Sequence, residues 1–202
     1  MSDVDDVGLL ERARRGDQEA FSRLFSRYQR AIYRYGVYMA GREAADDIVQ
    51  DTFLAVLQQR GRVDPPRGAV LAYLIGIARH RVLKRFAAVR DALRAEPLDD
   101  DAHDAAAADA ETALDDLARA ETIETVRAAV QALPAAYREA IVLCELQELP
   151  YVEAADVMQC PIGTVRSRLH RGRTLLAAAL NRGALDSETR SREVAHAGTR
   201  RT

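Results

Sequence analysis

The sequence predicts an all-α protein made of two small helical domains joined by a flexible acidic linker. Apolar residues recur at helical spacing from residue 7 to about residue 90 and again from about residue 123 to residue 180, and no stretch alternates in the manner of a strand. Between these regions Ala and acidic residues dominate, a composition typical of a solvated linker. We expect a first domain at residues 7–94, the linker at 95–120, a second domain at 121–181 and a disordered tail at 182–202.

Composition excludes several other classes of protein. Apolar residues make up 48% of the 202 residues, which is too many for a fully disordered chain. The sequence contains no apolar run of about eighteen residues, and its polar amino terminus lacks a secretion signal, so we expect a cytoplasmic protein with no membrane span. The two cysteines and four scattered histidines match no disulfide framework or metal-binding spacing. We therefore predict no metal, no cofactor and no enzymatic activity.

Breaks at Gly16, at Gly41 and across residues 61–68 divide the first domain into roughly four helices. The third of these has an apolar stripe made of Ala45, Val49, Phe53 and Val56. Its opposite face is made of Asp47, Gln50, Asp51 and Leu54. An exposed acidic face that contains a large leucine is either a solvated surface with one tolerated apolar residue or a docking surface for a partner protein.

The last helix of the first domain carries a mixed row of side chains opposite its apolar stripe. The stripe is made of Leu71, Ile75, Ala78, Val82, Phe86 and Val89, and the row of Tyr73, Ile77, His80 and Lys84. An aromatic ring stacks on an unpaired base while cations follow the phosphates, so this row favours binding of single-stranded DNA. Nearby arginines, among them Arg79, Arg81 and Arg85, add positive charge. The alternative is that Tyr73 is a half-buried packing residue.

The second domain contains the densest positive charge, in the stretch CPIGTVRSRLHRGR at residues 160–173, where no acidic residue occurs. Pro161 suits the first turn of a helix. The preceding YVEAADVM, residues 151–158, forms a short helix, and the tight link between the two helices predicts a helix-turn-helix.

In that motif the second helix enters the major groove of DNA, where arginine bonds guanine edges or phosphates. The buried stripe is then Val165, Leu169, Gly172 and Leu176, and the predicted DNA contacts are Thr164, Arg166, Ser167, Arg168, His170, Arg171 and Arg173. The alternative is an amphipathic helix whose arginines are only solvated. The lack of interleaved acidic residues disfavours it, because solvated helices usually pair Glu with Arg.

The stretch LPYVEAADVMQCPIGTVRSRLHRGRTLL closely resembles region four of the extracytoplasmic-function sigma factors of bacterial RNA polymerase. LLERARRGDQEAFSRLFSRYQRAIYRYGVYMAG resembles the opening of region two, and AADDIVQDTFLAVL resembles its polymerase-docking helix. The resemblance covers residues 7–90 and 121–180 in the order of the family's two domains. It implies a protein that lends promoter specificity to core RNA polymerase.

The resemblance also assigns tasks to the surfaces identified above. Asp47, Gln50, Asp51 and Leu54 would meet the clamp helices of the largest polymerase subunit. The row on the last helix of the first domain would recognise and open the minus-10 element, although relatives usually carry Trp, Asn and Asp where this chain has Tyr73, His80 and Lys84. The loop at residues 60–68 would hold an extruded base. The helix-turn-helix would read the minus-35 element as duplex.

The resemblance further implies an anti-sigma factor as a partner. The rival interpretation is a stand-alone helix-turn-helix regulator that binds promoter DNA as a dimer, which leaves the docking helix without a purpose. An enzyme with a DNA-binding tail finds little support, since no phosphate-binding loop or metal-binding spacing occurs.

Overall fold

The computed structural model describes residues 4–58, 65, 69–95 and 114–198. Every regular element in these ranges is helical, and the predicted all-α class is confirmed. The elements are α1 (Val4–Arg14), α2 (Gln18–Ala40), α3 (Arg42–Gln58), α4 (Val70–Ala95), α5 (Leu114–Gln131), α6 (Ala135–Ile141), the π-helical η1 (Val142–Leu146), α7 (Tyr151–Met158) and α8 (Ile162–Gly198).

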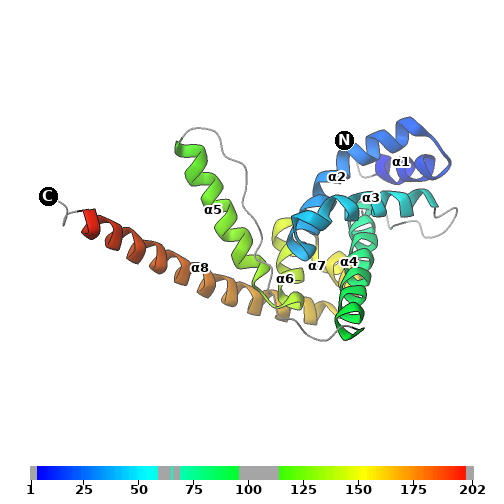
Figure 1. Cartoon of the computed structure of the whole chain (residues 1–202). Coiled ribbons are helices and arrows are strands. Elements are labelled where there is room, and N and C mark those ends of the chain that lie inside the picture. Colours follow the sequence, from blue (N-terminus) through cyan, green and yellow to red (C-terminus); the bar gives the residue numbers. More distant parts are fainter. Residues whose placement is uncertain (1–3, 59–64, 66–68, 96–113, 199–202) are drawn as a thin grey trace.

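The first domain is a bundle of α1 to α4 (Figure 1). The carboxylate of Asp17 caps α2 by accepting a hydrogen bond from the Ala20 amide at 3.0 Å, and α2 ends where Gly41 adopts a φ of 89°. Gly36 lies where α2 crosses α3. A Cβ at this position would be 3.1 Å from the Cα of Ala45, so the glycine allows the two helices to pack closely.

The second domain contains the predicted helix-turn-helix. Helix α7 follows Pro150 and ends at Met158, Gln159 adopts the left-handed conformation with a φ of 52°, and α8 begins just after Pro161. At Gly172, α8 crosses α6 so closely that a Cβ would lie 3.0 Å from Cγ1 of Ile141. This close contact with α6 fixes which side of α8 is buried and which side faces solvent.

Two predicted boundaries differ from the structure. Helix α5 begins at Leu114, inside the segment predicted as linker, while residues 96–113 of that segment lie outside the described residues. Helix α8 continues to Gly198, through most of residues 182–202, for which the sequence predicts a disordered tail. The physical reason is that residues 182–198 contain no proline and many helix-forming residues, which allow an existing helix to extend.

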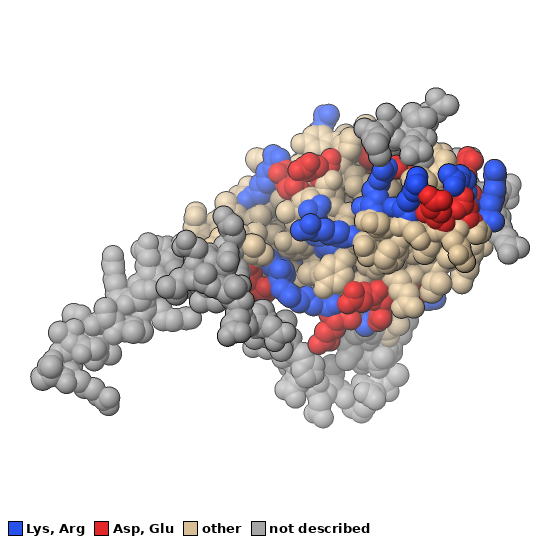
Figure 2. All heavy atoms as spheres, turned by 90° about the horizontal axis from the view of Figure 1, so that it is seen from above, with Lys and Arg blue, Asp and Glu red and all other residues tan. Residues whose placement is uncertain are grey.

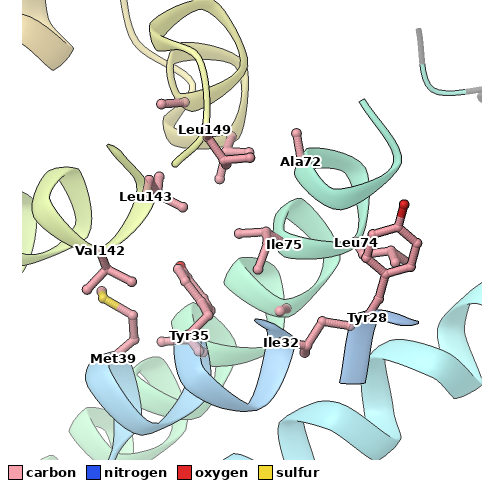
Figure 3. Close-up of a cluster of buried hydrophobic side chains, with 14 of the residues drawn as sticks. Tyr28, Ile32, Tyr35, Met39, Ala72, Leu74, Ile75, Val142, Leu143 and Leu149 are labelled. Atoms are coloured by element: carbon pink, nitrogen blue, oxygen red, sulfur yellow. The ribbon is translucent and has the colours of Figure 1, made fainter. Parts of the chain in front are cut away.

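The two domains share one apolar core (Figure 3). Tyr35 and Met39 of α2 and Ile75 of α4 face Val142 and Leu143 of η1, all of them buried. Leu149, just before α7, also joins this cluster. The sequence pattern identified the apolar faces of both domains, but it did not reveal that they cover one another.

Buried polar groups also cross between the domains. Glu139 of α6 accepts hydrogen bonds from the hydroxyl of Tyr35 at 3.1 Å and from Nε of Arg79 at 2.8 Å. Its side chain is only 9% exposed. Gln147 accepts a hydrogen bond from Arg34 at 2.7 Å and donates one to the carbonyl of Ala31 at 2.8 Å. These bonds satisfy groups that would be costly to bury alone.

Candidate nucleic-acid interface

Helix α8 exposes the basic face that the sequence predicted. Val165 and Leu169 are buried with exposures of 0% and 2%, and Gly172 is buried against α6. This burial turns the opposite side of α8 toward solvent. The predicted contact residues exposed there are Arg166, Ser167, His170, Arg171 and Arg173.

Two of the predicted contacts are half-buried at the edge of this face. The guanidinium of Arg168 lies 3.9 Å from Sγ of Cys160 in the turn of the helix-turn-helix. Thr164 donates its backbone amide to the carbonyl of Pro161 at 2.8 Å, and its own carbonyl accepts a hydrogen bond from the Ser167 hydroxyl at 3.0 Å. Arg168 therefore lies toward the turn, whereas Arg166 and Arg171 project outward.

Two neighbours of the basic face were missed in the sequence. Arg173 pairs with Glu145 of η1, which lies 28 residues earlier in the chain, and the hydrogen bond with this carboxylate raises the pKa of Arg173. The guanidinium carbon of Arg166 lies 5.9 Å from the ring centre of Tyr151, the first residue of α7. Glu145 could not be identified from the sequence because it is 28 residues away from Arg173. Tyr151 directly follows Pro150 and therefore begins the first helix of the helix-turn-helix, and this position could have identified it as a neighbour of the second helix.

On α4, the predicted row divides into a half-buried part and an exposed part. Tyr73 and Ile77 are half-buried, and His80 and Lys84 are exposed. The hydroxyl of Tyr73 accepts a hydrogen bond from Arg14 of α1 at 2.7 Å. Phe86, predicted to be buried, is 48% exposed, and Val82 is the last buried residue in the part of α4 whose burial is described, residues 70–88. Val89, also predicted to be buried, lies outside that part.

Helices α4 and α7 form the walls of a cleft of about 970 Å³. Tyr73, Ile77 and His80 line it on the side of α4, and Val152 and Asp156 line it on the side of α7. The sequence placed the row and the helix-turn-helix in separate domains. In the structure they lie next to each other.

The predicted acidic face of α3 is exposed as expected. Asp47, Gln50 and Asp51 are exposed, and Leu54 is 44% exposed. Gln50 and Leu54 also line a groove of about 510 Å³ whose other wall is formed by α2. This wall contains aromatic residues that the sequence analysis missed, namely Phe21, Phe25 and Tyr33. Their helical spacing along α2 is the signal that could have identified them.

Two of the arginines predicted to add positive charge near the row have acidic partners. Arg79 pairs with Glu139 at 2.8 Å, and Arg85 pairs with Asp47 at 3.3 Å. On the face shown in Figure 2, basic and acidic side chains alternate and do not form one basic surface. On α8, by contrast, residues 162–173 include no acidic side chain.

The described side chains contain no group of three or more His, Cys, Asp or Glu residues placed to hold a metal ion. Among the helices in residues 4–58, 69–95 and 114–198, none is long and apolar enough to cross a membrane. The predicted pocket at residues 60–68 lies outside the described residues except for Pro65.

Each of the two domains matches a family model. The family described as Sigma-70 region 2 matches residues 24–92, and that described as Sigma-70, region 4 matches residues 123–176. The chain is 32% identical over 188 residues to the RNA polymerase sigma-H factor of Pseudomonas aeruginosa, covering 89% of this chain and 96% of that protein. It is 32% identical over 179 residues to the ECF RNA polymerase sigma-E factor of Escherichia coli, covering 84% and 91%.

Two solved structures have a similar fold. CnrH, solved in complex with the cytosolic domain of CnrY, is similar with a TM-score of 0.62 and 26% identity, covering 87% of this chain and 97% of that chain. The sigma factor RpoE of Bartonella quintana, solved in complex with the anti-sigma factor NepR, is similar with a TM-score of 0.57 and 25% identity, covering 80% and 96%.

Proposed function

The chain belongs to the extracytoplasmic-function sigma factors of bacterial RNA polymerase, and we propose that three of its surfaces divide the family's task between them. A protein of this family binds core polymerase and directs promoter-specific transcription initiation. One observation supports this assignment of surfaces. The same chain has an exposed basic face on α8 of the helix-turn-helix and an exposed acidic face with a leucine on α3. Transcription in vitro with core polymerase on a promoter library tests the whole proposal.

The outer face of α8 is proposed to read the minus-35 element as duplex DNA. The first turns of a recognition helix lie nearest the bases, and arginine bonds a guanine edge through two hydrogen bonds. Arg166 and Arg171 project outward from this part of α8. Arg173 lies farther along α8 and already pairs with Glu145, so it suits a phosphate contact at the flank.

We expect Arg166→Ala and Arg171→Ala each to weaken specific duplex binding by about 1 to 3 kcal/mol, with the loss concentrated at particular positions of the minus-35 element. Arg173→Ala should weaken binding more evenly across sequences, because a phosphate contact carries no base information. Filter binding on a set of single-base variants of the element measures both patterns. Unchanged affinity and unchanged base preference in Arg166→Ala would contradict the placement of α8 in the groove.

The row on α4 is proposed to contact the unpaired strand of the minus-10 element. Lys84 and His80 form its exposed end, and Tyr73 and Ile77 lie deeper in the cleft beside α7. The chemistry of the row suits base stacking together with phosphate contacts. Because its residues differ from those usual in relatives, the base preference of this protein is expected to differ as well.

Tyr73→Ala should lose stacking worth about 1 to 3 kcal/mol and slow promoter opening more than initial binding. Lys84→Asp should weaken the contact with DNA and reduce its salt dependence, since one phosphate partner is lost. His80→Ala tests whether this side chain acts as a hydrogen-bonding group. Permanganate reactivity of promoter thymines, measured alongside filter binding, separates opening from binding. Wild-type opening in all three variants would leave the row as a solvated surface.

The face of α3 made of Asp47, Gln50, Asp51 and Leu54 is proposed to dock on the clamp helices of the largest polymerase subunit. An exposed leucine among acidic side chains suits a partner that offers both positive charge and an apolar contact. The neighbouring groove with Phe21 and Phe25 extends the apolar part of this surface.

The second function considered, a stand-alone helix-turn-helix regulator, predicts no binding to core polymerase. A pull-down of core polymerase with the full chain separates the two functions. We further propose that the protein acts in the cytoplasm without catalytic activity of its own. Because the similar sigma factor RpoE was solved with the anti-sigma factor NepR, we also propose an anti-sigma factor as a regulatory partner of this chain.

A further inference from the structure

Helix α1 places an arginine beside the row on α4. Helix α1 contacts both α2 and α4. Its residues Leu10 and Ala13 are buried, and the buried carboxylate of Asp6 accepts a hydrogen bond from the hydroxyl of Tyr28 at 2.6 Å. These contacts fix α1 against the bundle. Its last residue, Arg14, is thereby brought next to Tyr73, 59 residues away in the chain.

The contact between Arg14 and Tyr73 joins the polar end of the tyrosine to a cation. Nη2 of Arg14 donates to the Tyr73 hydroxyl at 2.7 Å, and the guanidinium carbon lies 5.3 Å from the ring centre. A ring held by its hydroxyl loses much of its freedom to tilt. A side chain ordered before binding costs less entropy when a base stacks on it.

The same contact adds positive charge at the inner end of the row. Lys84 provides a cation at the outer, exposed end, and Arg14 provides one at the end occupied by Tyr73. Lys84 follows Tyr73 by eleven residues of α4, about 16 Å at a rise of about 1.5 Å per residue, so the phosphate next to a base stacked on Tyr73 would lie near Arg14 and Lys84 would lie near another nucleotide of the strand. Cations along the backbone strengthen binding of single strands.

We infer that Arg14 is a positioning residue that holds the Tyr73 ring for promoter opening. This inference rests on the proposed contact between Tyr73 and the unpaired strand. Arg14 lies before residues 24–92, which match the region 2 family model, and inside the stretch from residue 9 that resembles the opening of region two. The residue acts through Tyr73 and needs no base contact of its own.

A double-mutant cycle on opening tests the inference. The full chain carrying Arg14→Ala, Tyr73→Phe or both is combined with core polymerase on a promoter from which the wild-type protein initiates. We expect each single variant to slow the appearance of permanganate-reactive thymines about 3- to 10-fold, because each removes the same charged hydrogen bond. The double variant should be no slower than the slower single variant, since coupled residues are not additive. The affinity of initial promoter binding should stay within about 2-fold of wild type, because the closed duplex offers no unpaired base to stack on Tyr73.

Controls separate this role from a structural one. Arg15→Ala removes an exposed neighbour that pairs with Glu11 at 3.7 Å, and it should open the promoter like wild type. If Arg14→Ala lowers the unfolding midpoint, Tyr73→Phe carries the test alone, because it keeps the ring and its packing. Additive effects in the cycle, or equal losses in binding and opening, would overturn the inference.

Tyr73→Ala distinguishes failure of the inference from failure of the proposed function. If Tyr73→Ala slows opening while Arg14→Ala and Tyr73→Phe do not, the row keeps its role and only the positioning by Arg14 is wrong. If Tyr73→Ala opens the promoter normally, the proposed contact of the row is wrong and the inference falls with it.

Discussion

Replacement of both Asp47 and Asp51 by Arg is expected to abolish capture of core polymerase while leaving the fold and duplex DNA binding intact. Both side chains are exposed on the same face of α3. Reversal of two charges at an interface opposes the potential of the partner, and placing like charges together costs several kcal/mol. The basic face of α8 belongs to another helix and does not include these residues.

The fold should survive this change because no buried contact is lost. Among the described residues, the ion pair that this change breaks joins Asp47 to Arg85 at 3.3 Å, and both side chains are largely exposed. Such a surface pair contributes about 0 to 1 kcal/mol. Thermal unfolding checks the fold, and a pull-down with core polymerase checks docking.

The single variant Asp51→Arg has a matched control in Glu19→Arg on α2. Both variants replace an exposed carboxylate by arginine, so they change the net charge equally. The control should capture polymerase normally. A folded Asp47→Arg, Asp51→Arg double variant that still captures core polymerase would show that docking uses another surface.

Glu139→Ala is expected to lower the free energy of unfolding by about 3 to 5 kcal/mol, the cost of removing one partner from a buried ion pair. Glu139 holds both Nε of Arg79 and the hydroxyl of Tyr35 between the domains. Without the carboxylate, the Arg79 charge and the fully buried Tyr35 hydroxyl would lose this acceptor. Urea unfolding measures the loss.

The position of this cluster gives the variant a second measurable effect. Because the three residues join α2, α4 and α6, loss of the carboxylate should also favour separation of the two domains, seen as a larger radius of gyration in small-angle scattering. Glu19→Ala is the control, since it breaks an exposed pair with Arg23 that contributes little. Equal unfolding midpoints for Glu139→Ala and Glu19→Ala would show that the bonds of Glu139 with Arg79 and Tyr35 do not stabilise the fold.

The pH dependence of stability gives an independent check on Tyr35. Burial, together with the Glu139 charge, raises the pKa of Tyr35 well above its usual value of 10.0. The unfolded chain therefore loses this proton before the folded chain does. The contribution of Tyr35 to stability is fully present below pH 10.0 and is lost as the pH rises above that value. Tyr35→Phe should reduce this alkaline loss.

The sequence alone determined the buried faces of α3 and of the first part of α8. In α3, Ala45, Val49 and Phe53 are buried as the periodicity predicted, and in α8 the same holds for Val165 and Leu169. Helical spacing fixes the direction of a side chain relative to its own helix, so apolar stripes can be identified locally. The helix-turn-helix could also be predicted locally, because Pro161 marks the start of its second helix and only a short link separates the two helices.

The sequence could not show which groups meet across the molecule. The sequence predicts that Arg79 and Arg85 add positive charge to the row on α4, but in the structure Arg79 pairs with Glu139 of α6 and Arg85 pairs with Asp47 of α3. Glu145 approaches Arg173 only because η1 lies beside α8. Charge pairing depends on distance in space, and helical periodicity contains no information about which helix is the neighbour.

What the sequence by itself determined is therefore the all-α class, the helix-turn-helix, the basic outer face of α8 and the acidic face of α3. Only the tertiary structure decided that the two domains share a core, that Tyr73 is half-buried beside α7, and that Arg14 holds its hydroxyl. The physical reason is that local patterns fix side-chain direction within a helix, whereas burial and pairing are set by the surface that another helix presents.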